Sequence, residues 1–173
     1  MAAATLLRGQ TKRTVFGFNQ YGMKRVPYRE AISNIAKIGY KSVELAMPTW
    51  DTEPKLLSKT DRANIPKQIA DLGLVLPSVM ESLRIAGPNV NKPGNLERLR
   101  VAAEMAHELS PKTPAITTLG GSAGMFDELK CEMADELAVW AKTMEPLKTV
   151  LAIRATPRRL CAVRKTCFGC WTK

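Results

Sequence analysis

The sequence predicts an α/β protein with parallel strands. Short runs of β-branched and aromatic residues alternate with longer amphipathic segments along most of the 173-residue chain. Strands separated by helices of this length are typical of right-handed βαβ units, in which neighbouring strands run parallel. The composition, 45% hydrophobic and 24% charged, is that of an ordinary globular protein, and the length predicts one domain.

Three strands and two helices are expected in the first half of the chain. The strands are predicted at 14–18, 41–47 and 74–80, and the helices at 28–38 and from about 64 to 72. Gly39 and Gly73 each follow a helix, where glycine often stops it. Residues 51–63 are predicted to form a loop. Pro66 is expected in the first turn of its helix, and Pro77 is unfavourable inside a central strand.

The second half continues the same alternation. Asn95 is expected to cap a helix that stops at Ser110, and strands are predicted at 114–119 and 150–153. The clearest amphipathic stripe of the chain lies between the last two strands and consists of Phe126, Leu129, Met133, Leu137, Trp140 and Met144. Residues 120–124, Gly-Gly-Ser-Ala-Gly, precede this helix. Their amides could hold a phosphate or another anion, and they also suit a plain turn.

The net charge of +10 is concentrated at the C-terminal end. Residues 151–173 contain six of the 26 Lys and Arg and none of the 16 Asp and Glu. Such a tail could bind nucleic acid through phosphates, but no basic stripe with interleaved aromatics runs through the body, so nucleic acid is not the favoured partner. Cys161, Cys167 and Cys170 lack a fourth zinc ligand and are interpreted as unpaired thiols in a reducing compartment.

These observations divide the chain into three parts. Residues 1–13 form an N-terminal extension, residues 14–154 the folded domain, and residues 155–173 an aberrant basic, cysteine-containing tail, which we interpret as a change of reading frame near Ala155. The apolar runs are far shorter than the ~18 residues of a membrane span, so no membrane partner is expected. A cytoplasmic location is predicted, with a removed or truncated export leader left open as an alternative.

Several short motifs occur in a familiar order. Residues 38–45 (IGYKSVEL) are followed by 72–74 (LGL), 77–79 (PSV) and, after the long amphipathic helix, 151–153 (LAI). Together they resemble the xylose isomerase-like TIM barrels, the sugar phosphate isomerase/epimerase family that shares its fold with endonuclease IV, over about residues 14–155. The resemblance implies a partial (β/α)₈ barrel of the first four to five βα units, since a closed barrel takes ~250 residues and at least ~200.

The resemblance also implies a chemistry. Members are metal-dependent isomerases or epimerases of sugars or sugar phosphates, in which Mn²⁺, Mg²⁺, Co²⁺ or Zn²⁺ polarises substrate oxygens and paired carboxylates move a proton. Arg154 stands at the usual Glu ligand position of the fifth strand, and the later ligands have no counterpart in this chain. The metal is therefore not expected to be bound by this chain alone. His107, the single histidine, borders an apolar helical stripe and is predicted to be a packing or edge residue rather than a metal ligand.

The reactive face of a βα barrel lies at the carboxyl ends of its strands. Glu44 and Glu81 are the candidate catalytic residues because they sit at matching ends of adjacent strands, although Glu44 could equally hold a backbone amide or a lysine. The candidate substrate-binding residues at the same edge are Asn19, Gln20, Tyr21, Trp50, Thr118, Gly120 and Gly121, with Thr117 also at the end of the fourth strand.

Three functions stay open at this point. The chain resembles a sugar isomerase/epimerase, truncated and with reduced or no activity. Alternatively it is a non-catalytic truncated paralogue or interaction module, or it contacts nucleic acid through its basic tail. A parallel half-sheet leaves strand edges and one face uncovered, so self-association through these edges is also expected.

Overall fold

The computed structural model describes residues 15–48, 51–119 and 126–154. Five strands in these ranges form one parallel sheet in the order β1-β2-β3-β4-β5, which confirms the predicted α/β class. The strands are β1 (Gly17–Asn19), β2 (Ser42–Ala46), β3 (Val79–Glu81), β4 (Ala115–Leu119) and β5 (Val150–Arg154). The helices are the 3₁₀ helix η1 (Gln20–Met23), α1 (Tyr28–Ile38), α2 (Lys59–Asp71), α3 (Lys92–Leu109) and α4 (Phe126–Met144).

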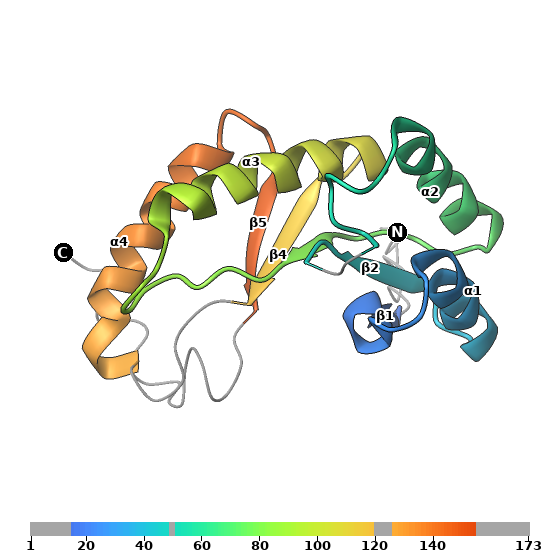
Figure 1. Ribbon diagram of the computed structural model, residues 1–173, viewed down its shortest axis with the longest axis horizontal. Coiled ribbons are helices and arrows are strands. Elements are labelled where there is room, and N and C mark those ends of the chain that lie inside the picture. The colour runs from blue at the N-terminus through green and yellow to red at the C-terminus, as the bar shows by residue number, and fades with distance from the viewer. Residues whose placement is uncertain (1–14, 49–50, 120–125, 155–173) are drawn as a thin grey trace, which may run out of the picture.

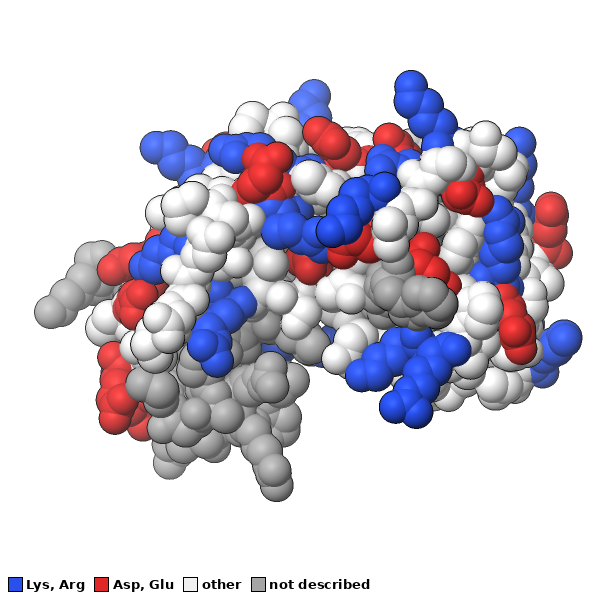
Figure 2. All heavy atoms as spheres, viewed as in Figure 1, with Lys and Arg blue, Asp and Glu red and all other residues white. Residues whose placement is uncertain are grey.

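The N-terminal extension and the basic tail lie outside the described residues, as do Trp50, Gly120 and Gly121. Side chains of both charge signs are scattered over the described part of the face seen in Figure 2. Within the described ranges β1 and β5 are the outer strands of the sheet, so self-association through strand edges stays a prediction.

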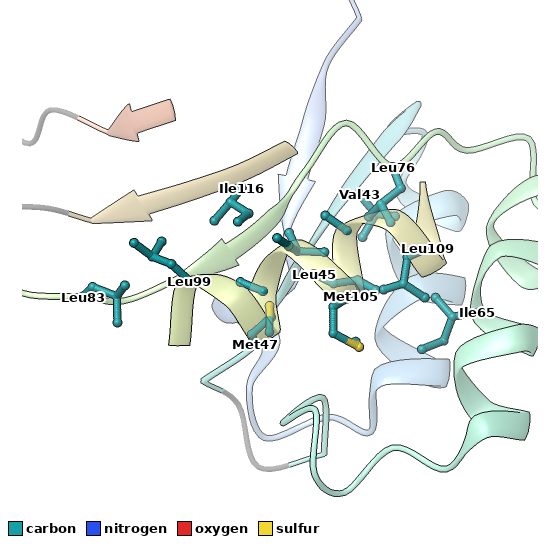
Figure 3. Packing of buried hydrophobic residues seen from close by; sticks show 14 of the residues in the cluster. Val43, Leu45, Met47, Ile65, Leu76, Leu83, Leu99, Met105, Leu109 and Ile116 are labelled. Atoms are coloured by element: carbon teal, nitrogen blue, oxygen red, sulfur yellow. The ribbon is translucent and has the colours of Figure 1, made fainter. Parts of the chain in front are cut away.

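The sheet has two sides of different character. The helices form an arc along one side (Figure 1), which we call the helix-facing side. Alternate strand residues point to this side and pack in the core, as successive side chains of a strand point to opposite faces. Figure 3 shows Val43, Leu45 and Ile116 of the strands beside Leu99 and Met105 of α3. The remaining strand residues, such as Glu44 and Thr117, point to the opposite side, which we call the inner face.

Two helices follow their sequence patterns closely. α1 occupies the predicted range of 28–38 and ends at Gly39, whose φ of 104° is in the left-handed region. In α4 the whole predicted stripe is buried or packs against the core. This apolar face of α4 packs against α3 and β5.

The beginning of α2 differs from the prediction. α2 starts at Lys59 rather than near residue 64, so 59–63 are helical and Pro66 lies inside the helix instead of its first turn. Ser58 is the reason, because it forms a capping box with Asp61. The Ser58 hydroxyl accepts from the Asp61 amide at 3.1 Å, and the Asp61 carboxylate accepts from the Ser58 amide at 3.3 Å.

The start of α3 also differs from the prediction. Asn91, not Asn95, is the cap: its side-chain oxygen accepts from the Gly94 amide at 3.0 Å, and Lys92 is the first helical residue. Pro93 falls in the first turn, where a missing N–H is tolerated.

The first and third strands also differ in extent. β1 spans 17–19 rather than 14–18. β3 is reduced to 79–81, and the predicted segment before it contributes only an isolated bridge between Ser42 and Val75. Pro77 separates this bridge from β3, because proline has no N–H to donate to a neighbouring strand. None of the described helices is both long and apolar enough to cross a membrane.

Replacing Ser58 with alanine tests the origin of α2. Ser58→Ala removes the hydroxyl that caps the helix, and we expect it to lower the free energy of unfolding by about 1 kcal/mol in urea titrations followed by circular dichroism. The Ser58 hydroxyl and then Arg29 hold the pKa of Asp61 below its ordinary value. The stabilisation from the ionised Asp61 carboxylate is present at neutral pH and is lost as the pH falls through its lowered pKa. The difference in unfolding free energy between the wild type and Ser58→Ala therefore becomes smaller in acid. Ser82→Ala, in an exposed position, is the matched control; equal stabilities of the two variants would contradict the capping role.

Candidate functional site

Four donors surround the carboxylate of Glu44 on the inner face. Its Oε1 accepts from the hydroxyls of Ser78, at 2.6 Å, and Thr117. Its Oε2 accepts from the guanidinium of Arg154, at 2.6 Å, and from the side-chain amide of Asn19. The Glu44 side chain is only 9% exposed. We refer to these five residues as the Glu44 cluster.

The sheet positions every member of the Glu44 cluster. Asn19 is the last residue of β1 and lies directly beside Glu44 in the register of β1 and β2. Thr117 and Arg154 belong to β4 and β5, and Ser78 immediately precedes β3. The cluster therefore draws one residue from each strand or its approach. Asn19 and Arg154 end their strands, whereas Glu44 and Thr117 lie in the middle of theirs.

The hydrogen bonds around Glu44 determine what it can do. A carboxylate has about four lone-pair sites, and the four donors occupy that number. Glu44 therefore has no site left to ligate a metal or to accept a proton from a substrate unless a donor leaves. The hydroxyls of Ser78 and Thr117 direct their protons to Glu44, so their oxygens keep lone pairs that can accept from a ligand.

Glu81 lies on the other side of the sheet. Its Oε2 accepts from Nε and Nη2 of Arg98 on α3, at 3.0 and 2.5 Å, and its Oε1 accepts from the Ser82 amide at 3.0 Å. Arg98 also pairs with Glu53, which precedes α2. Burial raises the pKa of Glu81, and the Ser82 amide and Arg98 oppose that shift. The arrangement joins β3, α3 and residues before α2 on the helix-facing side.

Glu44 and Glu81, predicted at matching ends of adjacent strands, therefore point to opposite sides of the sheet. The core residues Leu74 and Leu76 point to the helices, and so does Val79. If side chains alternated strictly between the two sides from Leu76 onward, Val79 would point to the inner face. Because Val79 points to the helices instead, the alternation is shifted by one residue around Pro77 and Ser78. This slip brings Ser78 to the inner face and turns Glu81 toward α3.

Three other predicted substrate-binding residues lie outside the Glu44 cluster. Thr118 is fully buried and its hydroxyl accepts from the Leu83 amide at 3.3 Å on the helix-facing side, whereas its neighbour Thr117 lies on the inner face. Gln20 is buried, and its side-chain oxygen accepts from the Ala46 amide at 3.4 Å. Tyr21 is 43% exposed, with the ammonium of Lys24 5.1 Å from its ring centroid.

His107 is exposed at the edge of α3 and makes polar contacts. Its Nε2 lies 2.8 Å from the carbonyl oxygen of Leu147 and 3.2 Å from the hydroxyl of Thr149. Both partners precede β5, at the amino end of the sheet, which places His107 at the opposite end from the Glu44 cluster.

Sequence reasoning missed Ser78, Arg98 and Glu53. Ser78 lies in the 77–79 motif, but its direction depends on the slip at Pro77. Arg98 lies near Glu81 because α3 returns across the sheet, a contact between residues 17 positions apart. Only the signal of a buried carboxylate in need of a cation could have indicated such a partner.

A divalent cation does not fit the donors in the described part of the chain. No group of three or more His, Cys, Asp or Glu in these ranges could hold a metal ion. The lone pairs of Glu44 are taken by protein donors, one of them the positively charged Arg154.

Comparisons with known proteins find the fold in solved structures. No family model and no curated protein matches the sequence. The probable 3-DHS dehydratase AsbF from Bacillus anthracis matches with a TM-score of 0.69 at 12% identity, over 84% of this chain and 54% of that chain. A sugar phosphate isomerase/epimerase from Parabacteroides distasonis matches with a TM-score of 0.55 at 14% identity, over 84% and 52%. A xylose isomerase-like TIM barrel/4-hydroxyphenylpyruvate dioxygenase fusion protein matches with a TM-score of 0.52 at 17% identity, over 74% and 20%.

These matches agree with the observed sheet and helices. The chain is a parallel α/β protein whose helices cover one side of its sheet. More narrowly, it has the fold of part of a xylose isomerase-like TIM barrel, and it spans about half the length of the first two proteins named.

Replacing Arg98 tests the role assigned to Glu81. Arg98→Leu leaves Glu81, which is 2% exposed, without its guanidinium. Removing one partner of a buried pair costs about 3–5 kcal/mol, and because Arg98 is 31% exposed we expect a loss of about 2–3 kcal/mol in the free energy of unfolding at neutral pH. The pKa of Glu81 rises further without Arg98, so the loss shrinks in acid, where Glu81 takes up a proton.

The matched control is Arg100→Leu on the same helix. Arg100 is 52% exposed and pairs only with Glu97 among the described residues, at 3.5 Å, so its loss changes stability by less than about 0.5 kcal/mol. Denaturant titrations of both variants at neutral and acidic pH make the comparison. Similar losses in the two variants, or a loss for Arg98→Leu that is independent of pH, would contradict a buried Glu81–Arg98 pair.

Proposed function

We propose that the chain binds a sugar or sugar phosphate at the Glu44 cluster, as the ligand-binding part of an enzyme of the sugar isomerase/epimerase type. The observation that carries this proposal is the convergence of four donors on Glu44 at the inner face, namely Asn19, Ser78, Thr117 and Arg154. Such a row of hydroxyl, amide and guanidinium groups matches a ligand that offers several hydroxyl groups.

The fold supports the same ligand class without fixing the reaction. The matched proteins include one described as a sugar phosphate isomerase/epimerase and one described as a probable dehydratase. One fold serves different reactions, so the choice must come from the site.

In this proposal Glu44 is a positioning residue. It fixes the directions of the Ser78 and Thr117 hydroxyls, whose oxygens accept hydrogen bonds from ligand hydroxyls. A general base needs a free lone pair within reach of the proton it removes. Because Glu44 has none in this arrangement, we propose that turnover through Glu44 is slow or absent. No step through a metal is derived, since the described donors do not suit one.

Calorimetric titration of the full chain with D-xylose and with D-fructose 6-phosphate tests the proposal. Thr117→Val removes an acceptor hydroxyl at nearly constant shape, and we expect it to weaken binding about fivefold, as the loss of one hydrogen bond of about 1 kcal/mol requires. Bound ligand should also raise the melting temperature of the wild-type chain.

Thr143→Val is the matched control. Its hydroxyl lies on the exposed side of α4 and donates to the Val139 carbonyl at 2.9 Å, so binding should stay at the wild-type level. The proposal fails if neither compound binds the wild-type chain, or if both threonine variants bind equally well.

A further inference from the structure

We propose that Arg154 is the anion-recognising residue of the inner face, and that ligand binding there requires no divalent cation. The inference rests on the proposed function and narrows its ligand class to hydroxylated compounds that carry a carboxylate or phosphate group.

Arg154 is held on one side and open on the other. Its Nη2 donates to Oε2 of Glu44 at 2.6 Å, while 44% of its side chain is exposed. Glu44 is the partner that Arg154 contacts within residues 15–48, 51–119 and 126–154. A guanidinium carries five N–H donors in a rigid plane, and Glu44 engages one of its three nitrogens. The remaining donors can bind an oxyanion.

The contact with Glu44 prepares Arg154 for this role. A free arginine side chain loses rotamer entropy when it is fixed, and the existing ion pair already restricts Arg154. Preorganisation of this kind increases affinity because less ordering remains for the binding step. The planar fork matches two oxygens of a carboxylate or phosphate, which a lysine cannot do.

The negative charge of Glu44 does not prevent an anion from binding. Glu44 is compensated by three further donors besides Arg154, namely Asn19, Ser78 and Thr117. The carboxylate is almost buried, with 9% of its side chain exposed, whereas the guanidinium reaches solvent. An approaching anion therefore meets the cation first.

The neighbouring groups specify the rest of the ligand. The hydroxyls of Ser78 and Thr117 bind one oxygen of Glu44, and Arg154 binds the other. Acceptor oxygens and a cationic donor thus flank the same carboxylate. A compound with a hydroxyl group a few bonds from its acidic group can bind the acceptor oxygens and the guanidinium at once. The guanidinium then supplies the positive charge that a metal ion would otherwise supply.

The experiment measures binding of five compounds to the full chain in the presence of EDTA. They are D-gluconate, D-fructose 6-phosphate, neutral D-xylose, acetate and inorganic phosphate, titrated by calorimetry. We expect the first two to bind more tightly than D-xylose, and Arg154→Gln to weaken them about 10- to 100-fold, the range for hydrogen bonds to a charged group. A comparison of the affinities for D-gluconate and D-fructose 6-phosphate shows whether the site prefers a carboxylate or a phosphate.

Two further variants keep the result interpretable. Arg154→Lys retains the charge beside Glu44 but lacks the fork, so it should fold and still bind the acidic compounds more weakly than the wild type does. Arg100→Gln, an exposed arginine of α3, should bind like the wild type. Circular dichroism verifies that each variant is folded.

Each outcome bears on a different claim. Binding of acidic and neutral sugars with equal affinity, unchanged in both Arg154 variants, overturns the inference and leaves the proposed function intact. Binding that EDTA abolishes and Mn²⁺ restores also overturns the inference. Binding of acetate or phosphate through Arg154, without binding of any sugar, overturns the proposed function and leaves the anion site.

Discussion

A carboxylate buried on the inner face of a parallel sheet must be surrounded by donors, because an uncompensated charge in that position would be strongly unfavourable. Glu44 meets this requirement with four donors that come from β1, the approach to β3, β4 and β5. One carboxylate at the centre of the sheet therefore links strands that are far apart in the sequence. The same contacts that compensate its charge set the directions of the groups exposed at the candidate site.

The helix-facing side meets the same requirement in a different way. Glu81 is compensated by Arg98 of α3 and the Ser82 amide, and Arg98 also holds Glu53. Here the ion pairs fix a helix and a connection against the sheet, whereas the Glu44 cluster opens toward solvent through Arg154. Glu44 and Glu81, on the adjacent strands β2 and β3, thus have separate roles because they point to opposite sides of the sheet.

The sequence predicts the parallel sheet, α1, α4 and the strand order well, since these depend on long apolar periods and glycine stops. It predicts the start of α2 poorly, because Ser58 and Asp61 form a local capping box that apolar periodicity does not contain. The sequence names four of the five residues of the Glu44 cluster, because they lie at or near the ends of predicted strands: Asn19, Glu44, Thr117 and Arg154. The remainder depends on the direction of single residues. The slip at Pro77 turns Ser78 and Glu81, and one step along β4 separates Thr117 from Thr118.

The central claim is that Glu44 is tied to its neighbours by strong hydrogen bonds. A double-mutant cycle with Glu44→Gln and Thr117→Val measures one of these bonds directly, since both changes nearly preserve shape. From denaturant titrations of the four proteins we predict a coupling energy of about 1–2 kcal/mol, typical of a hydrogen bond to a charged group. Additive effects of the two substitutions, with a coupling energy near zero, would contradict the account.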